Sequence, residues 1–256
     1  MQPIDRIENI KNWIFNYVTE MPNPANCLVV GISGGIDSSV VSTISAMTGL
    51  KTLVVCMPIH QRPEQHDLSI AHKNWLTNKF KNAYGVDVDL TYVFNAFENS
   101  LTDLKFTSQL GLANSRARLR MMCLYQIAAS CNGIVVGTGN KVEDFGVGFF
   151  TKYGDGGVDI SPIGDCLKTD VWKMGKELKI LDEIIMADPT DGLWSDGRTD
   201  VDQLGMSYKE LEIAMQDPSD KNYTKYLELR IKNLHKMKSI PVCKFDGKTT
   251  LETNKK

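Results

Sequence analysis

The sequence predicts an α/β fold, a doubly wound parallel sheet with helices on both faces. Three observations predict it: short apolar runs typical of buried strands, helical segments between them, and the spacing of strand–helix–strand crossovers. The first apolar run ends in VVGISGGIDSSVV (29–41), where glycines, hydroxyls and an acid interrupt the hydrophobic pattern. We expect the strands at 27–32, 52–57, 88–94 and 133–137.

Helical periodicity places helices between and after these strands. Ile4, Ile7, Ile10 and Ile14 recur at helical spacing and predict an opening helix that ends before Pro22. Further helices are expected at 38–47, 70–84, 110–130, 169–178, 207–215 and 221–235. The segment 188–205 contains turn residues and acids but little periodicity, so we expect a functional loop, a lid that ATP orders.

Length and charge limit the possible functions. The 256 residues suit a single domain, 1–256. A net charge of −2 gives no general argument for nucleic acid or a membrane as partner, so any basic site must be local. The start of the sequence lacks the pattern of a signal peptide, and no uncharged apolar stretch approaches the roughly 20 residues of a spanning helix.

The cysteine pattern indicates a reducing compartment. Six cysteines are scattered along the chain, and no two form a CxxC pair. Most lie within apolar runs, as free buried thiols do. We therefore expect a cytoplasmic protein without a disulfide framework or a cysteine-rich metal site.

The loop 31–39 follows the first predicted strand, at the strand end where open parallel sheets collect their ligands. Consecutive backbone N–H groups around Ser33, Gly34 and Gly35, together with the start of the next helix, form a concave anion site. The alternative is a capped strand–helix turn, in which Gly-Gly only makes the bend.

Two common phosphate loops do not fit this stretch. Walker A requires a lysine that is absent here, and the glycine spacing differs from that of the dinucleotide-binding fingerprint. What remains is SGGxDSS, with Asp37 beside the phosphate cradle. Because a carboxylate repels phosphate unless a cation lies between them, Asp37 suggests a Mg²⁺ ligand.

The complete SGGxDSS segment after a strand resembles the PP-loop of the ATP pyrophosphatases, which transfer AMP and release pyrophosphate. In that reading the loop binds ATP through Gly31, Ser33, Gly34, Gly35, Asp37, Ser38 and Ser39. The loop alone leaves several families open: GMP synthetases, argininosuccinate synthetases, tRNA thiolation and lysidine enzymes, and NAD synthetases.

Five further segments favour one of these families. They are NSRARLRM (114–121), GTGNKVED (137–144), GFFTKYGDGGVDISPIG (148–164), KTDVW (168–172) and DPTDGLW (188–194). Together with SGGxDSS they resemble ammonia-dependent NAD synthetase over about residues 5–245. The resemblance implies an adenine nucleotide alpha hydrolase-like, Rossmann-like fold.

The resemblance also implies a reaction. ATP would adenylate the nicotinate carboxylate of deamido-NAD with release of pyrophosphate, and ammonia would then displace AMP to give NAD. ATP is then a co-substrate and Mg²⁺ the metal. The alternative is another PP-loop adenylating ligase, GMP synthetase-like or tRNA-modifying.

Residue roles follow from chemistry and from the resemblance. Glu143 follows the fourth predicted strand, so it can reach the same crevice as Asp37 and share the Mg²⁺. The resemblance implies ATP contacts for Thr138, Lys168 and Thr190, and catalytic roles for Asp155, Lys168 and Asp159. It implies substrate binding by Asn114, Arg118, Arg120, Phe149, Lys152, Tyr153, Asp155, Asp159, His235 and Lys236. Each residue also has a structural alternative, such as a capping hydroxyl or a solvated charge.

The sequence departs from the family pattern in three places. Met237 replaces an arginine after His235 and Lys236, residues 57–60 differ from the family's adenine-contact loop, and one extra residue lies between Glu143 and Gly148. The synthetase signature begins by residue 29, so we expect no glutaminase domain and free ammonia as the nitrogen donor. The resemblance further implies a homodimer, for which the first helix and 110–130 are candidate interface segments.

Overall fold

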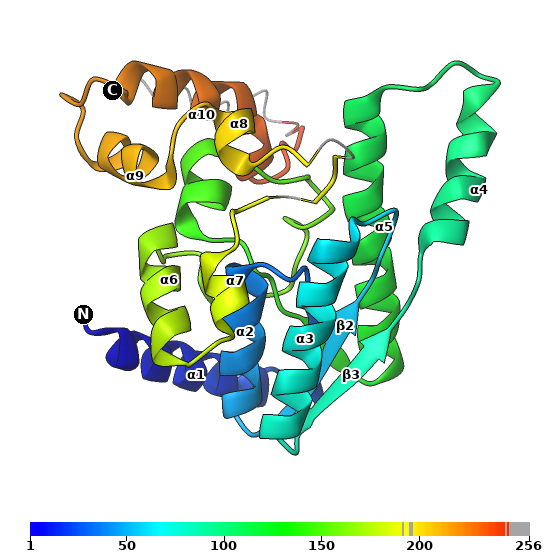
Figure 1. The fold of residues 1–256 in the computed structure, drawn as a ribbon, viewed down its shortest axis with the longest axis vertical. Coiled ribbons are helices and arrows are strands. Elements are labelled where there is room, and N and C mark those ends of the chain that lie inside the picture. The colour runs from blue at the N-terminus through cyan, green and yellow to red at the C-terminus, as the bar shows by residue number, and fades with distance from the viewer. Residues whose placement is uncertain (191, 195–196, 244, 246–256) are drawn as a thin grey trace.

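The computed structural model describes residues 1–190, 192–194, 197–243 and 245. Within them a parallel sheet of four strands has the order β3-β2-β1-β4 (Figure 1). The strands are β1 (Cys27–Gly31), β2 (Lys51–Cys56), β3 (Ala83–Asp87) and β4 (Gly133–Val135). β1 pairs with β2 and with β4, so it lies inside the sheet, and its residues are buried on both faces.

Helices cover both faces of this sheet, which confirms the predicted doubly wound α/β fold. They are α1 (Pro3–Glu20), α2 (Ile36–Met47), α3 (Pro63–Lys79), α4 (Thr91–Thr102), α5 (Gln109–Ser130), the π-helix η1 (Lys141–Val147), α6 (Lys168–Glu177), α7 (Asp182–Met186), α8 (Asp200–Leu204), α9 (Tyr208–Gln216) and α10 (Tyr223–Met237). Among the described helices, none is both long and apolar enough to cross a membrane.

The buried apolar residues divide into three clusters. One joins α1, α2, α3 and α6 to the first face of the sheet. The second joins α4 and α5 to the opposite face. The third lies beyond the sheet, where η1 packs against α8, α9 and α10. Through this cluster the C-terminal helices pack on η1, the element that follows β4, and Figure 1 shows α8, α9 and α10 grouped at one end of the molecule.

The predicted third strand, 88–94, is wrong. The strand is β3 at 83–87, and the following residues enter α4. β3 is an edge strand with mostly accessible residues, so its apolar signal is weak. The Asp89 side chain accepts a hydrogen bond from the Thr91 N–H at 2.8 Å, which starts the helix despite the strand-like composition of LTYVF.

The helix predicted at 70–84 is α3, which starts seven residues earlier and ends before β3. Pro63 occupies its first turn, where a missing N–H is tolerated. Its buried side chains include Ser69, His72 and Lys73, so the apolar periodicity understates the buried face. His72 is fully buried and lies 2.9 Å from the Ser42 hydroxyl of α2.

The single insertion expected between Glu143 and Gly148 would fall within the π-helix η1, which spans Lys141–Val147. A π-helix holds one more residue per turn than an α-helix segment of the same length, so it accommodates a single insertion locally. Gly148 ends it with a φ of 69°, in the left-handed region.

The buried face of α4 provides a test of the corrected assignment. Phe94 is fully buried, and the Arg116 guanidinium lies 4.9 Å from its ring centre. We predict that Phe94→Ala lowers the free energy of unfolding by about 3–5 kcal/mol, as measured by urea denaturation. The matched control is Tyr92→Ala on the same helix, where the side chain is 83% exposed, with a change below about 0.5 kcal/mol. Equal effects would contradict a helix at this position.

Candidate active site

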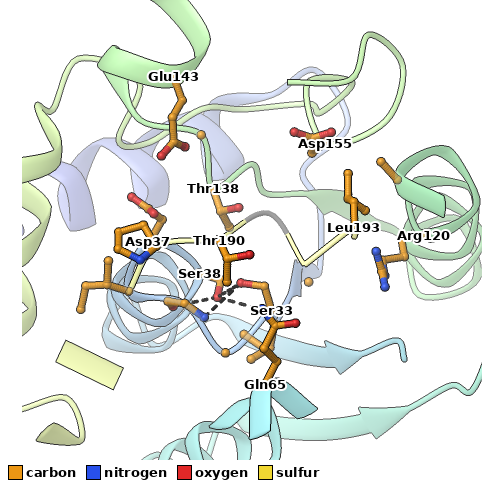
Figure 2. A pocket seen from close by; sticks show the side chains of 18 of the residues that line it. Ser33, Asp37, Ser38, Gln65, Arg120, Thr138, Glu143, Asp155, Thr190 and Leu193 are labelled. Carbon is orange, nitrogen blue, oxygen red and sulfur yellow. Dashed lines mark hydrogen bonds between the residues drawn. The ribbon is translucent and has the colours of Figure 1, made fainter. Parts of the chain in front are cut away.

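A cavity of about 310 Å³ opens at the carboxyl ends of β1 and β4. Its walls come from the loop after β1, the loop after β4, η1, α5, the start of α6 and the segment 187–193. In the view of Figure 2, Asp37 and Glu143 lie together on one side, and Arg120 and Leu193 lie opposite them. Both the position and the volume are typical of a small-molecule site in an open parallel sheet.

Packing against α3 gives the loop after β1 its shape. Gly34 has a φ of 89°, and a Cβ there would lie 2.8 Å from the backbone oxygen of Gln65. Only glycine fits both constraints without moving the chain. The Ser38 hydroxyl accepts a hydrogen bond from the Ser33 N–H at 3.2 Å and donates to the Gly35 carbonyl at 3.1 Å. The loop is therefore held in a curved form before any ligand arrives.

The predicted ATP-binding residues of this loop do not all face the cavity. Gly31, Ser33, Gly34, Gly35, Asp37 and Ser38 line it. Ser39 does not: it is fully buried, and its hydroxyl donates to the Gly35 carbonyl at 2.9 Å. Its geometry favours a role in holding the loop.

Three charged side chains from distant parts of the sequence meet at one edge of the cavity. The Lys168 ammonium donates to Asp37 Oδ2 at 2.5 Å and to Glu143 Oε1 at 3.0 Å. The Lys168 side chain is 3% exposed, and both carboxylates are 16% exposed. One buried ammonium thus forms ion pairs with two carboxylates, and the cluster has a net charge of −1 when all three groups are ionised.

Burial and Coulombic attraction act in opposite directions on these pKa values. Burial alone would lower the pKa of Lys168, but the two carboxylates outweigh it and raise that pKa above its ordinary value. Burial raises the pKa of Asp37, and the charge of Glu143 adds to the rise although Lys168 opposes it. Burial also opposes ionisation of Glu143, yet Lys168 and the Tyr208 hydroxyl hold its pKa below the ordinary value.

Asn140 links the two carboxylates through the start of η1. Its side-chain oxygen accepts hydrogen bonds from the N–H groups of Val142 and Glu143, at 3.0 and 3.1 Å. Its amide nitrogen donates to Asp37 Oδ1 at 3.1 Å. Because Asn140 is fully buried, one side chain fixes both the position of Glu143 and the rotamer of Asp37.

Glu212 of α9 supports Lys168. Lys168 is the first residue of α6, and the preceding Leu167 offers no side-chain cap. Glu212 supplies the missing acceptor, since it receives the Thr169 N–H at 2.9 Å and the Thr169 hydroxyl at 2.8 Å. A carboxylate at a helix N-terminus is favourable. The position of Lys168 therefore depends on a contact between two helices.

The donor set at this edge fits Mg²⁺ that arrives with a nucleotide. Within the described residues, no group of three or more His, Cys, Asp or Glu side chains could hold a metal ion. Mg²⁺ commonly uses one or two carboxylates together with substrate phosphates and water. Asp37 and Glu143 provide two such oxygens beside the phosphate-loop N–H groups, and their shared net charge of −1 favours a cation.

Asp155 and Phe149 also line the cavity, and the Phe149 N–H donates to the Glu143 carbonyl at 2.8 Å. The Asp155 carboxylate accepts a hydrogen bond from the Thr151 N–H at 3.0 Å, and the Thr151 hydroxyl donates to Asn114 at 2.7 Å. Asp155 lines the cavity and keeps a large accessible surface, yet many protein groups surround its carboxylate. This enclosure raises its pKa to about 6.

Lys236 of α10 lies close to these residues. Its ammonium donates to the Phe150 carbonyl at 2.7 Å and lies 5.0 Å from the Phe150 ring centre. Burial lowers the pKa of Lys236, while Asp155 and Asp144 oppose that change. His235, its neighbour in the sequence, is exposed and does not line the cavity.

Three other predicted residues line the main cavity: Thr138, Thr190 and Arg120. The Thr190 hydroxyl donates to the Arg198 carbonyl at 3.1 Å, so these two residues lie side by side. Arg120 donates to the Met57 carbonyl at 2.9 Å and to the Gln61 side chain at 3.0 Å.

Arg118 and Tyr153 lie elsewhere, in a shallow hollow next to the cavity. Arg118 donates to the Lys152 carbonyl at 3.1 Å, and the Lys152 ammonium lies 5.4 Å from the Tyr153 ring centre. The three residues thus form one group outside the main cavity.

The geometry of Asp159 favours a structural role over the predicted catalytic one. One carboxylate oxygen accepts the Tyr125 hydroxyl at 3.0 Å, and the other accepts the Val135 N–H at 2.7 Å. Tyr125 belongs to α5 and Val135 to β4. Asp159 does not line the cavity. Its carboxylate ties the loop after Thr151 to the edge of β4.

Sequence reasoning missed several residues of the site: Asn140, Asp144, Leu193, Asp200, Tyr208 and Glu212. A signal existed for Asn140, which precedes a helix and has an acid three residues later. Asp144 lines the cavity because Gly139 opposite it has no side chain, and burial and its acidic neighbours raise its pKa. Tyr208 and Glu212 gave no signal, because Tyr208 contacts Glu143 and Glu212 contacts Thr169, each more than 40 residues away in the sequence.

Fold and site together define a nucleotide-binding type of α/β protein, with a phosphate loop and a charged cluster at the strand ends. The chain belongs to the NAD synthase family, whose model matches residues 6–249. An NH(3)-dependent NAD(+) synthetase from Carboxydothermus hydrogenoformans is 38% identical over 211 residues, which cover 81% of this chain and 83% of the relative.

Two solved structures share the fold. An NMN synthetase from Francisella tularensis is similar at 31% identity with a TM-score of 0.85, over 96% of this chain and all of that one. An NH3-dependent NAD synthetase from Campylobacter jejuni has a TM-score of 0.74 at 23% identity, over 95% of this chain and all of that one. The second likeness concerns the fold alone.

The phosphate loop can be tested at Gly34. We predict that Gly34→Ala abolishes ATP binding in isothermal titration calorimetry, because the new methyl group must displace the backbone at Gln65. Gly49→Ala is the control: Gly49 also has a positive φ, 79°, but open space surrounds it. That variant should lose about 1 kcal/mol of stability and keep its ATP affinity. Normal ATP binding by Gly34→Ala would contradict the loop assignment.

Proposed function

We propose that the protein is an ATP-dependent carbon–nitrogen ligase that converts deamido-NAD to NAD with ammonia. The observation that carries this proposal is the joint presence, in one cavity, of the phosphate loop, the Lys168 cluster and Asp155. Membership of the NAD synthase family and the 38% identical NH(3)-dependent relative support the substrate and the nitrogen donor. The same family membership argues against a GMP synthetase-like or tRNA-modifying ligase.

In the first step the nicotinate carboxylate attacks the α-phosphorus of ATP. The bond to the bridging α–β oxygen breaks, and pyrophosphate takes its electron pair. Pyrophosphate would lie against the loop at Ser33, Gly34 and Gly35, where its oxygens would replace the serine hydroxyls that now accept from the N–H groups of Ser33 and Gly35. The ammonium of Lys168 would lie near the charge that develops. Thr138 and Thr190 would donate to phosphate oxygens from the same wall.

We assign Asp37 and Glu143 as the Mg²⁺ ligands. Bound Mg²⁺ would neutralise phosphate charge next to these carboxylates and so make the leaving group a weaker base. Without a cation the two carboxylates would repel the phosphates, since Lys168 compensates only one of their charges.

In the second step ammonia attacks the carbonyl carbon of the acyl-adenylate, and AMP leaves. The new C–N bond forms with a proton to lose, and the Asp155 carboxylate lies on the cavity wall where it can accept that proton. Phe149 would stack on the nicotinate ring. Arg118, Lys152 and Tyr153 would contact the remainder of the nucleotide from the neighbouring hollow.

The pKa of Asp155 predicts a pH dependence. Because its pKa is about 6, the carboxylate is half protonated near that pH and gains its negative charge above it. We predict that kcat at saturating ammonium rises with pH through about 6, and that Asp155→Asn is slow and lacks this limb. Asp165→Asn, which alters an exposed carboxylate paired with Lys141, is the control and should keep the wild-type profile. An unchanged limb in Asp155→Asn would refute the assignment.

A second candidate substrate is nicotinate mononucleotide, with nicotinamide mononucleotide as the product. The observation that favours it is the likeness to the NMN synthetase from Francisella tularensis, at 31% identity over nearly the full length of both chains. The two substrates carry the same nicotinate carboxylate, so the chemistry above applies to either. They differ only in the adenylate half of the dinucleotide.

A single assay distinguishes these functions. Purified protein is incubated with ATP, Mg²⁺ and ammonium together with deamido-NAD or nicotinate mononucleotide, and the amide and AMP are measured. We predict equal amounts of amide and AMP, and a higher kcat/KM for deamido-NAD. A higher value for the mononucleotide would select the second candidate. If the folded protein produced no amide from either substrate, both candidate functions would be excluded. Xanthosine monophosphate and tRNA would then be tested as substrates.

We further propose free ammonia as the direct nitrogen donor, a homodimer as the assembly and the cytoplasm as the compartment. If glutamine without an added amidase supported the same rate as ammonia, the proposal of free ammonia as the direct donor would be contradicted. The apolar side chains of Leu110, Met122 and Tyr125 on α5 are exposed, which supports a subunit interface there. Light scattering tests the homodimer, because a dimer has twice the molar mass of one chain. All six cysteines are free thiols, as expected in a reducing compartment.

A further inference from the structure

Tyr208 occupies a fixed position next to the Lys168 cluster, although no motif marks it. It is the first residue of α9, and the preceding Ser207 forms a reciprocal capping box with Glu210 that fixes the start of the helix. Its side chain is 3% exposed and packs edge-on against Trp172 of α6, with ring centres 6.0 Å apart. The ring therefore has little freedom to move.

The Tyr208 hydroxyl lies between two carboxylates. It is 2.5 Å from Glu143 Oε1 and 2.6 Å from Asp200 Oδ2, and it has a single proton to donate. Glu143 Oε1 also accepts from the Lys168 ammonium. Since both donors use the same oxygen, they fix the orientation of the Glu143 carboxylate and leave Oε2 to other partners. The Lys168 ammonium also lies 4.7 Å from the Tyr208 ring centre.

Asp200 connects this hydroxyl to the segment that carries Thr190. Asp200 is 5% exposed and begins α8, where Thr199 and Asp202 form a capping box. Its N–H donates to the Pro189 carbonyl at 3.0 Å, which closes the base of the segment next to Thr190. The side chain of Asp200 thus meets Tyr208 while its backbone holds one wall of the cavity.

We propose that Tyr208 is a positioning residue that orients Glu143 for Mg²⁺ and couples this orientation, through Asp200, to the backbone at Pro189, next to Thr190. The inference rests on the proposed role of Glu143 as a Mg²⁺ ligand. A tyrosine that only filled the apolar cluster around α9 would need one acceptor for its hydroxyl proton, not two carboxylates. The short contacts to both carboxylates and the ring contact with Lys168 are what distinguish the two roles.

The test is Tyr208→Phe, which keeps the ring, its contact with Trp172 and its contact with Lys168. Titration of the protein with ATP at a series of Mg²⁺ concentrations, followed by calorimetry, gives the Mg²⁺ concentration for half-maximal ATP binding. We expect this concentration to rise about 10-fold, as is typical when a residue that supports a metal ligand is removed. ATP binding without Mg²⁺ should change little.

The control is Tyr226→Phe, a buried tyrosine of the same apolar cluster on α10. It should leave the Mg²⁺ dependence unchanged. If Tyr208→Phe also leaves it unchanged and alters only the melting temperature, the positioning role is overturned. This readout requires no turnover, so failure of the ligase assay and failure of this inference are separate results.

Coupling to Asp200 is tested by a double-mutant cycle with Asp200→Asn on the same Mg²⁺ titration. If Tyr208 acts through one connected network, the double variant shifts the half-saturating Mg²⁺ concentration by less than the product of the two single shifts. If the shifts of the half-saturating Mg²⁺ concentration simply multiply, the coupling through Asp200 is overturned. If Asp200→Asn does not shift this concentration, Tyr208 acts on Glu143 alone.

Discussion

The interaction on which the site depends is the shared ion pair of Lys168 with Asp37 and Glu143. A buried ammonium is strongly unfavourable without partners, and here two carboxylates compensate it within 3.0 Å. Removal of Lys168 would leave two uncompensated carboxylates in a closed environment, whereas removal of either carboxylate would leave one neutral ion pair. The cluster therefore constrains the three segments that supply its members, namely the starts of α2, η1 and α6, to meet at one point.

The rest of the fold maintains that meeting point. β1 and β4 are adjacent in the sheet, so the segments after them emerge side by side. Asn140 joins the first two segments, and Glu212 holds the start of the third. The C-terminal helices thereby act on the site indirectly, as supports for residues on the sheet. This explains why the chain forms a separate apolar cluster beyond the sheet, where α9 and α10 pack on η1.

Sequence reasoning identified the fold, because buried strands have strong local patterns, and it named the three charged residues Asp37, Glu143 and Lys168 that the structure brings together. It misplaced β3, since an accessible edge strand has little apolar periodicity, and it treated the strand-like LTYVF as the strand. It also expected a catalytic role for Asp159, because the family resemblance around KYGDGGVD implies one for both of its acids. Only the structure shows that protein donors occupy both oxygens of one of them. Tyr208 and Glu212 act through contacts between distant helices, which no local pattern encodes.

The central claim is that this cluster supports adenylate transfer from ATP. Its most direct test is exchange of labelled pyrophosphate into ATP, with deamido-NAD and Mg²⁺ present and ammonia absent. The account predicts exchange in the wild type, loss of exchange in Lys168→Met, and full exchange in Lys141→Met, which removes only an exposed ion pair with Asp165. An exchange rate in Lys168→Met equal to that of the wild type would contradict the central claim. So would the absence of exchange in the folded wild type with either deamido-NAD or nicotinate mononucleotide.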